Sequence, residues 1–246
     1  MCGRYVSTRS PAELTSLFHT DPPPEELALE PSWNVAPTDD VWAVLERVDR
    51  DTGEIQRQLR AVRWGLVPSW AKSPNVGPKM INARVESVAD KPAYRRPFAK
   101  RRCLLPADGF YEWQSVEVPG RAKPRKQPYF ITPEDGSVMA LAGLYEFWRD
   151  PEAGDDDPAA WRTTCTIITT DARDAAGRIH PRMPLAIPAT DYVSWLDPAH
   201  EDPHALRDLM ITPAAGHLMA RPVSTAVNNV RNDGPQLIEE AHPADG

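Results

Sequence analysis

The number of prolines is the feature that most restricts how this chain can fold. Of its 246 residues, 27 are proline. Proline lacks a backbone N–H and breaks helix interiors, so the composition favours strands and turns over long helices. A chain of this length can bury the core of one large domain or of two small ones.

Segments rich in β-branched and aromatic residues, bounded by Pro, Gly or Asp, predict a series of strands. They are Val41–Val48, Leu59–Trp64, Arg102–Leu105, Phe110–Val116, Tyr129–Thr132, Val138–Trp148 and Thr164–Thr169, with a late strand over His217–Val223. Glu134-Asp135-Gly136 is typical of a hairpin turn between two of them.

Helices are expected to be few and short. Ser10-Pro11-Ala12-Glu13 is a capping box with proline at the first helical position, and it predicts a helix over residues 11–18. Ala189–Leu196 and His204–Met210 are shorter helix candidates, whereas Pro22–Pro31 is expected to be an extended loop. We therefore expect an α+β fold, with one β-rich domain over residues 1–240 and a disordered tail over residues 241–246.

Several classes of protein are disfavoured by what the sequence lacks. No apolar run approaches a membrane span and no signal region opens the chain, so a cytoplasmic protein is expected. Cys2, Cys103 and Cys165 have neither CxxC nor metal-ligand spacing, which indicates neither a disulfide framework nor structural zinc. The GxSxG, Walker, HExxH and GxGxxG signatures are also missing.

Charge is distributed unevenly along the chain. The net charge of −7 argues against a nucleic-acid partner. However, residues 91–102 and 121–126 form two basic runs, and a local basic surface on an acidic protein can bind phosphate. The alternative for either run is a solvated charged face.

Cys2 offers a reaction that no internal cysteine can perform. If Met1 is removed, Cys2 carries an α-amine and a thiol on adjacent carbons. The amine can condense with an aldehyde to an imine, and the thiol can then close a five-membered thiazolidine. The unperturbed pKa is roughly 7.7–8.0 for an α-amine and about 8.5 for a thiol, so some of each nucleophile is available near neutrality. The alternative is an ordinary cysteine near a strand start.

Polar residues within apolar or aromatic segments are further candidates. In the segment from Ile81 to Glu86, the Asn82 amide could orient an amine and Arg84 could hold a phosphate, or the segment could be a plain turn. Glu112 lies in an aromatic setting that suits acid–base chemistry, and its alternative is a solvent-facing strand glutamate.

A histidine and two tryptophans complete the candidates. His180 lies in a proline-stiffened loop, where function concentrates, although a structural histidine is the alternative. Trp70 and Trp113 lie beside polar loops, and their rings could stack on unpaired bases.

Taken together, the chain resembles the SRAP family (SOS response-associated peptidase), whose members shield abasic sites in DNA. The matching blocks run in the family's order from end to end: MCGRY at 1–5, WNVAPT at 33–38, RWGLVPSWA at 63–71, INARVES at 81–87, CLLPADGFYEW at 103–113, IHPRMP at 179–184 and VNNVRNDG at 227–234. This resemblance implies a single SRAP-type domain, in which mixed antiparallel sheets form a barrel-like core with short peripheral helices.

The resemblance also implies a function. Such a protein senses abasic sites in single-stranded DNA and crosslinks itself to them covalently through a thiazolidine, by lyase-type Schiff-base chemistry that shields the lesion. It would act as a monomer without a cofactor and would associate with the nucleoid when bound to damaged DNA. The family's peptidase label would then describe self-processing.

Residue roles follow from the matched blocks. Cys2 would be the nucleophile, Asn82 would position its amine, Glu112 would transfer protons and His180 would hydrogen-bond the sugar ring oxygen. DNA would be held by phosphate-binding arginines and by residues that splay or stack bases: Arg4, Arg84, Arg182, Pro37, Trp70 and Trp113. This chain has Pro181 where many relatives carry an acid.

Two other functions fit parts of the sequence. A cysteine N-terminal-nucleophile peptidase or amidase would also use an N-terminal Cys with a nearby Asn. A non-catalytic module would bind single-stranded DNA with strong salt dependence and without preference for a lesion.

Overall fold

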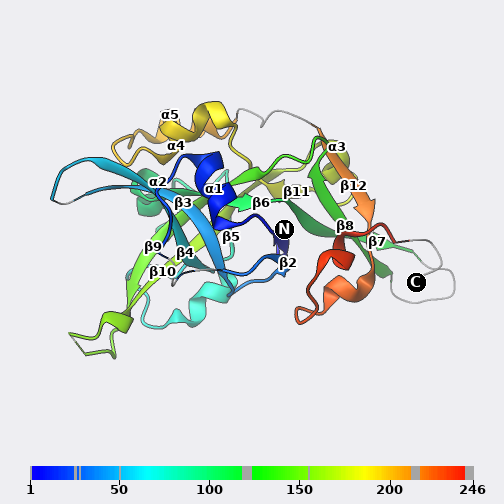
Figure 1. Ribbon diagram of the computed structural model, residues 1–246, viewed down its shortest axis with the longest axis horizontal. Coiled ribbons are helices and arrows are strands. Elements are labelled where there is room, and N and C mark those ends of the chain that lie inside the picture. The colour runs from blue at the N-terminus through cyan, green and yellow to red at the C-terminus, as the bar shows by residue number, and fades with distance from the viewer. Residues whose placement is uncertain are drawn as a thin grey trace.

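The computed structural model describes residues 2–24, 27, 29–49, 51–117, 124–154, 156–211 and 217–241. Two sheets make up most of the molecule, one of seven strands and one of five. Figure 1 shows the larger sheet on the left and the smaller on the right, with the N-terminal end of the chain where the two meet. The α+β fold class is confirmed.

The larger sheet contains a closed barrel of five strands. These are β3 (Asp40–Val48), β4 (Ile55–Trp64), β6 (Arg102–Ala107), β9 (Met139–Arg149) and β10 (Trp161–Asp171). The order β10-β4-β3-β6-β9 returns to its start because β9 also pairs with β10. Only the β4–β10 contact in this ring is parallel. Closure leaves none of the five strands with an open edge along the ring.

Two short strands extend the barrel at β10 and bring candidate residues to its end. β5 (Asn82–Arg84) pairs in parallel with Ile167–Thr169 of β10, and β11 (Arg182–Pro184) pairs antiparallel with the last residues of β10. β10 therefore lies between the two short strands that carry Asn82 and Arg182.

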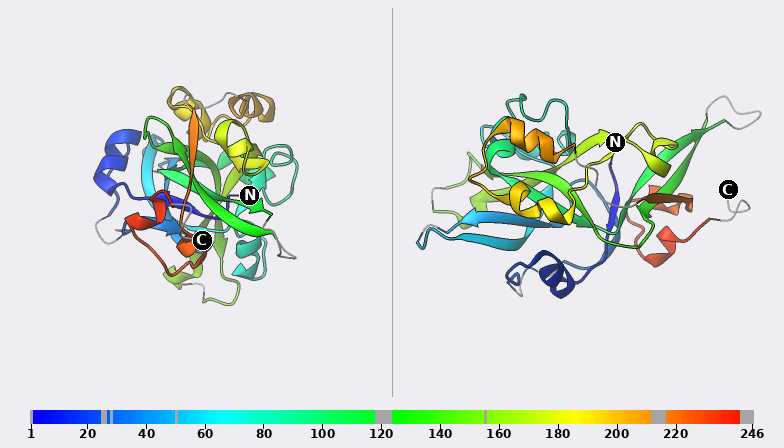
Figure 2. Two further views of the ribbon diagram at one scale, coloured as in Figure 1. Left: turned by 90° about the vertical axis from the view of Figure 1, so that its right-hand side faces the viewer. Right: turned by 90° about the horizontal axis from the view of Figure 1, so that it is seen from above.

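The smaller sheet has the order β12-β8-β7-β1-β2. Its strands are β1 (Tyr5–Ser7), β2 (Ser32–Val35), β7 (Gly109–Val116), β8 (Arg125–Pro133) and β12 (Leu218–Pro222). Figure 2 shows this sheet projecting from one end of the barrel. The chain passes directly from β6 of the barrel through Asp108 into β7, so the two sheets share a continuous backbone.

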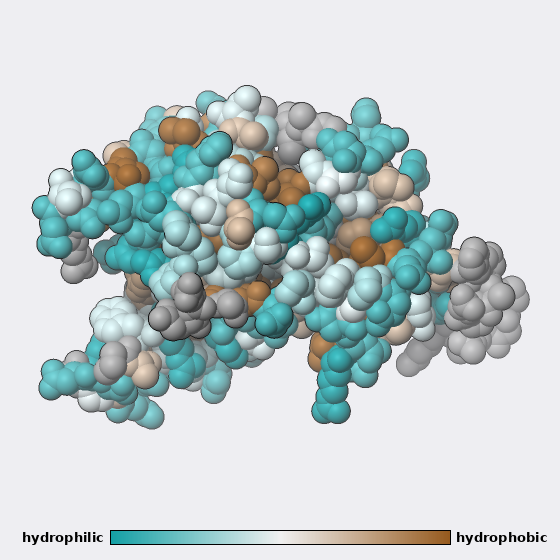
Figure 3. All heavy atoms as spheres, in the orientation of Figure 1, coloured by the Kyte–Doolittle hydropathy of each residue, from teal (hydrophilic) through white to brown (hydrophobic). Residues whose placement is uncertain are grey.

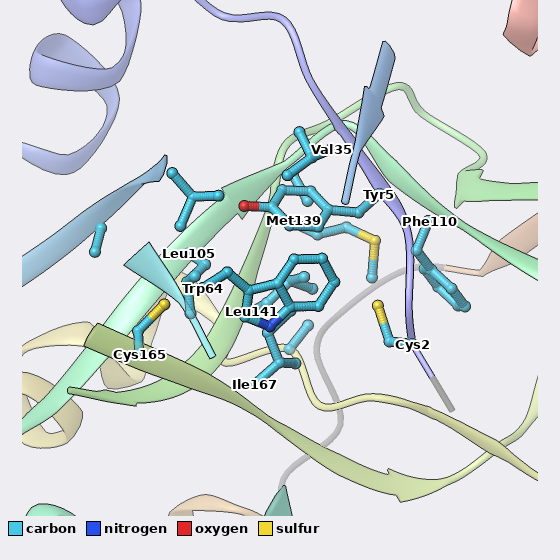
Figure 4. Packing of buried hydrophobic residues seen from close by; sticks show 14 of the residues in the cluster. Cys2, Tyr5, Val35, Trp64, Leu105, Phe110, Met139, Leu141, Cys165 and Ile167 are labelled. Carbon is cyan, nitrogen blue, oxygen red and sulfur yellow. The ribbon is translucent and has the colours of Figure 1, made fainter. Parts of the chain in front are cut away.

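The barrel strands are buried on both faces, because successive side chains point alternately into the barrel and outward to a second hydrophobic cluster. In β6, Cys103, Leu105 and Ala107 belong to the cluster inside the barrel, whereas Leu104 belongs to the cluster outside it. The outer cluster includes residues of the peripheral helices α1 (Pro11–Phe18), α2 (Arg95–Lys100), α4 (Tyr192–Leu196) and α5 (Pro203–Leu209). The inner cluster contains Cys2 and Tyr5 beside Trp64 (Figure 4).

The remaining helical segments are short connections: α3 (Asp174–Gly177) and the 3-10 turns η2 (Pro74–Lys79), η3 (Pro158–Ala160), η4 (Ala189–Asp191), η5 (Thr225–Asn228) and η6 (Pro235–Ile238). Within the described part of the chain, no helix is long and apolar enough to cross a membrane. The face seen in Figure 3 is mainly hydrophilic, with small groups of hydrophobic side chains.

Most predicted elements are confirmed, with shifted ends. The helix over 11–18 has the predicted bounds, and both hydrogen bonds of its capping box form between Ser10 and Glu13. All seven strands predicted between residues 41 and 169 are present, and so is the predicted late strand. The sequence did not predict β1, β2, β5, β11, α2 or α3, because elements of three to six residues are too short to show a periodic pattern.

The predicted hairpin at Glu134-Asp135-Gly136 is wrong. A turn does form there, with Gly136 at φ 69° and its N–H donating to the Pro133 carbonyl. However, β8 and β9 belong to different sheets. Turn residues specify the reversal of the chain, whereas pairing follows burial, and β9 pairs with β6 and β10 inside the barrel wall. Of the predicted disordered tail, residues 242–246 lie outside the described residues.

The first basic run is partly a structural element, which corrects its reading as one basic surface. Arg101 forms an ion pair with Glu146 at 2.8 Å. Arg102 is only 1% exposed. It donates to backbone carbonyls of Phe98, Ala99, Trp195, Asp197 and His200, which ties helices α2 and α4 to the barrel. Arg121 and Lys123 of the second run lie outside the described residues.

Candidate active site

Cys2 lies at the end of the barrel that faces the smaller sheet. Its side chain is fully buried in the cluster that also contains Tyr5, Trp64 and Phe110. In Figure 4, Cys2 lies beside Phe110, and Cys165 lies on the far side of Trp64. Because β1 pairs with β7 through Tyr5 and Phe110, the first residues of the chain are anchored next to the strand that carries Glu112.

Asn82 contacts Cys2 directly. Its amide Nδ2 donates to the Cys2 carbonyl oxygen at 2.7 Å. The backbone around Asn82 is fixed by β5 pairing and by two side chains, since the Trp64 indole donates to the Ile81 carbonyl and the Tyr94 hydroxyl donates to the Asn82 carbonyl. Asn82 Oδ1 is buried and accepts no hydrogen bond from the described residues. The plain-turn alternative for this segment is therefore wrong at Asn82, which is a strand residue.

Glu112 is a buried carboxylate on β7. It is only 4% exposed, so the solvent-facing alternative is wrong. Neighbouring Tyr111 is buried as well, because both faces of the smaller sheet are covered. One face packs against the end of the barrel, and the other carries Tyr111 in a cluster with Val6, Phe130 and Val227. Burial raises the pKa of the Cys2 thiol to about 12, and the negative charge of Glu112 adds to this rise. The two groups therefore interact electrostatically.

His180 completes the group of four. Its Nδ1 lies 3.9 Å from Glu112 Oε1. The same Nδ1 lies 3.0 Å from both the backbone N–H and the carbonyl oxygen of Arg182. When Nδ1 accepts from that N–H, the neutral imidazole carries its proton on Nε2. In this chain, which has Pro181 directly after the histidine, the Arg182 backbone therefore orients the imidazole ring. Pro181 is itself held in place, because its carbonyl accepts from the Ala172 N–H.

The three predicted phosphate-binding arginines differ in their surroundings. Arg84 is exposed, and its side chain makes no hydrogen bond or ion pair with other described residues. Arg182 is 15% exposed and donates to the carboxylates of Glu86 and Asp171. Arg4 donates to Asn34 Oδ1 at 2.8 Å. Arg84 is therefore available to an anion, whereas Arg182 would have to exchange carboxylates for a phosphate.

Of the residues predicted to contact bases, Trp113 and Pro37 lie near the site and Trp70 lies apart. The Trp113 indole N–H donates to Asn228 Oδ1 at 2.7 Å, and Arg4 Cζ lies 5.9 Å from the Trp113 ring centroid. Pro37 lies two residues after the end of β2, the neighbour of β1. Trp70 is 67% exposed in the loop after β4. No hydrogen bond, ion pair or ring contact among the described residues joins Trp70 to the group of four.

Two supporting residues escaped the sequence prediction. Tyr94 donates to the Asn82 carbonyl and Asn34 accepts from Arg4, and neither contact follows a regular spacing along the chain. Asn34 lies inside a matched block, but spacing gave no sign of its contacts with residues almost 200 positions away. Within the described ranges, no group of three or more His, Cys, Asp or Glu side chains is placed to hold a metal ion.

Comparison with known proteins identifies the family of this chain. The profile of the family described as SOS response associated peptidase (SRAP) matches residues 1–230. The abasic site processing protein YoqW of Bacillus subtilis is 37% identical over 239 residues, which cover 97% of this chain and 99% of YoqW. The abasic site processing protein HMCES of Gallus gallus is 35% identical, over 85% of this chain and 66% of its own length.

A solved structure shares the fold. A crystal structure of a protein from Bacteroides thetaiotaomicron superposes with a TM-score of 0.78 at 21% identity, covering 98% of this chain and 100% of that one. The profile match over nearly the whole sequence and the identity to YoqW decide the family of this chain. It belongs to the SRAP family.

Proposed function

We propose that this protein acts on abasic sites in single-stranded DNA and joins itself to them through a thiazolidine formed by Cys2. Relatives at 35–37% identity are named abasic site processing proteins, which supports the substrate. The observation that carries the chemistry is the 2.7 Å hydrogen bond from Asn82 Nδ2 to the Cys2 carbonyl. It fixes the backbone of the residue that would supply both nucleophiles.

The reaction requires a free amine on Cys2. Hydrolysis of the Met1–Cys2 peptide bond would release Met1 and leave this amine. The base-free deoxyribose of an abasic site opens to a C1′ aldehyde, which the amine attacks to form a carbinolamine. Loss of one water gives the imine. The buried Oδ1 of Asn82 is the acceptor that would orient an N–H of this amine toward its attack.

Ring closure then uses the thiol. Sulfur bonds to C1′, the imine nitrogen gains a proton, and the thiol proton leaves, so the whole sequence from aldehyde to thiazolidine releases one water. Because burial and Glu112 disfavour a free thiolate, the thiol proton must pass to a base as the S–C1′ bond forms. Glu112 is the buried carboxylate beside it, and proton transfer to Glu112 keeps only one negative charge in the site.

The raised pKa of the Cys2 thiol supports this chemistry over that of a cysteine peptidase. Enzymes that use a cysteine as their first nucleophile depend on a thiolate whose pKa is lowered by cations or helix N-termini. Here the pKa of the Cys2 thiol is raised to about 12. An amine that attacks first, followed by a thiol that closes a ring, makes no demand for a standing thiolate.

The remaining residues have roles that fit their surroundings. With its proton on Nε2, His180 would donate to the ring oxygen of the sugar and favour ring opening. The exposed Arg84 would bind a flanking phosphate, and Arg4 would bind phosphate through its Nη2 end while Nη1 keeps its contacts with Asn34 and Val227. Arg182 would bind phosphate only after releasing its carboxylate partners. Trp113 would stack on a base next to the lesion, and Pro37 would help to splay the bases. Trp70, which lies apart from the site, would stack on a base farther along the strand.

The test is a mixture of protein, its N-terminus verified as Cys2, with single-stranded DNA carrying one abasic site. We expect an adduct that survives SDS and heat, with the mass of protein plus DNA less one water, and none with intact DNA. Salt-labile binding of both DNAs without an adduct would indicate a non-catalytic binding module instead. Hydrolysis of peptides or amides without an adduct would favour the amidase alternative.

Two variants separate the nitrogen from the sulfur step. Cys2→Ala keeps the amine after removal of Met1, so it should form only an imine that borohydride must trap. Cys165→Ala is the matched control, since Cys165 is equally buried but lies across Trp64 from Cys2. It should crosslink like the wild type. A stable adduct from Cys2→Ala without borohydride would rule out the thiazolidine.

A further inference from the structure

Asn34 on β2 is a buried amide that links segments far apart in the chain. It is 3% exposed. Its Nδ2 donates to the carbonyl oxygens of Asn232 at 2.7 Å and Asn229 at 3.1 Å, with a longer contact to that of Val227 at 3.4 Å. Its Oδ1 accepts from Arg4 Nη1 at 2.8 Å. The amide therefore uses both its donors and its acceptor within the protein.

The carbonyls belong to one stretch, residues 224–233, which we call the C-terminal segment. It contains η5 and lies against the smaller sheet, where Val227 is buried with Val6 and Tyr111. One more bond ties its end to β2, since Trp33 N–H donates to Asp233 Oδ1 at 2.7 Å. Most of the stretch from residue 228 to residue 233 is exposed, so these polar contacts replace a hydrophobic anchor there.

Two of the residues proposed to bind DNA contact successive residues of this segment. Arg4 Nη1 donates to the Val227 carbonyl at 2.9 Å as well as to Asn34. The Trp113 indole donates to Asn228 Oδ1. Arg4 Nη1 thus faces the segment, and the Nη2 end of the guanidinium makes no hydrogen bond with other described residues. The C-terminal segment therefore orients both the Arg4 guanidinium and the Trp113 ring.

We propose that Asn34 is a positioning residue, whose amide locks the C-terminal segment so that Arg4 and Trp113 are preset for a single DNA strand. This inference rests on the proposed function for the identity of the ligand. The geometry behind it is a closed set of hydrogen bonds among Asn34, Arg4 and Val227, with Trp113 attached through the next residue. Preset groups lose less conformational freedom on binding, so affinity depends on the lock.

Asn34→Asp is the sharpest variant, because a carboxylate still accepts from Arg4 but cannot donate to the three carbonyls. Three quantities are measured: the rate of trypsin cleavage after the exposed Arg231, the Kd for undamaged single-stranded DNA, and the adduct rate at saturating abasic DNA. Asn75→Ala is the matched control, an exposed asparagine whose side chain makes no hydrogen bond with other described residues.

We expect Asn34→Asp to be cleaved faster at Arg231 and to bind undamaged DNA about 5- to 20-fold more weakly. The adduct rate at saturation should stay within about twofold, because Cys2, Asn82 and Glu112 are untouched. Faster cleavage with an unchanged Kd would overturn the proposal, since the segment would then be held without positioning DNA groups. Unchanged cleavage and Kd would overturn it as well.

A second variant decides the matter if Asn34→Asp does not fold. Asn228 is exposed, so Asn228→Ala should fold normally while it frees the Trp113 indole. We expect weaker binding of undamaged DNA at an unchanged thermal unfolding temperature, and an unchanged Kd would overturn the proposal. Binding of undamaged DNA needs no crosslinking, so a wild type that forms no adduct would defeat the proposed function and leave this test valid.

Discussion

Removal of the Asn82 amide is the most direct perturbation of the proposed chemistry. In Asn82→Ala, the Cys2 carbonyl loses the donor that now lies 2.7 Å away. After Met1 is removed, the Cys2 amine would also lack the buried Oδ1 that we propose as its acceptor. Nothing else in the described site replaces either group. The backbone of β5 should persist, because its pairing with β10 does not involve the side chain.

The size of the effect follows from the energy of a buried hydrogen bond. A buried polar group left without its partner costs about 1–3 kcal/mol. If this cost falls on the transition state for imine formation, the reaction slows by about 5- to 150-fold, since each 1.36 kcal/mol is a factor of ten. Binding of undamaged DNA should change little, because Asn82 holds Cys2 and no phosphate contact is assigned to it.

The assay is a single-turnover crosslinking time course with excess protein over abasic single-stranded DNA, at several protein concentrations. We expect a lower maximal rate with a similar half-saturating concentration. Asn82→Asp should be slower still, because its carboxylate faces the Cys2 carbonyl in place of the amide. A maximal rate for Asn82→Ala equal to that of the wild type would refute the positioning role.

Four further predictions test individual features of the structure. Arg84→Ala should lower the slope of log Kd against log salt for single-stranded DNA by about 0.7, measured by anisotropy titrations. Arg102→Met should lower the free energy of unfolding in urea by about 3 kcal/mol or more, because several backbone carbonyls lose a charged donor. Gly143→Val should cost about 1–3 kcal/mol in the same assay, since a Cβ there would lie 2.2 Å from Leu105 Cδ1. The pKa of the Cys2 thiol rises from 9.0 to about 12 on folding, so its contribution to stability is full below pH 9.0 and is lost as pH rises toward about 12. The free energy of unfolding of the wild type, with Met1 retained, should therefore fall relative to Cys2→Ala by up to about 1.4 kcal/mol per pH unit above pH 9.0.

For each of these four predictions, one result would contradict the reasoning. An unchanged salt slope would mean that Arg84 does not contact phosphate. Wild-type stability in Arg102→Met would mean that the helix carbonyls find other donors, and wild-type stability in Gly143→Val would mean that the barrel wall relaxes around the new side chain. A pH-independent difference between wild type and Cys2→Ala would show that the thiol titrates alike in the folded and unfolded chains.

Local chemistry along the chain accounts for what the sequence predicted well. The capping box of Ser10 and Glu13 specified a helix to the residue, because both hydrogen bonds form within four residues. Long strands such as β9 and β10 were found because β9 buries a long run of apolar and aromatic side chains and β10 buries several β-branched ones. The turn at Gly136 was also found, yet the pairing of its flanking strands was not, since partners of a buried strand are chosen by the whole core.

By itself, the sequence determined that the chain is β-rich, that Cys2 can supply an aminothiol, and which residue types accompany it. Only the tertiary structure decided that Glu112 is buried and that its charge acts on the Cys2 thiol, that Arg182 is paired with carboxylates, and that Arg102 is part of the core. It also decided that Asn34 holds the C-terminal segment. The physical reason is that burial and hydrogen-bond partners arise from contacts between distant segments, which spacing along one chain does not record.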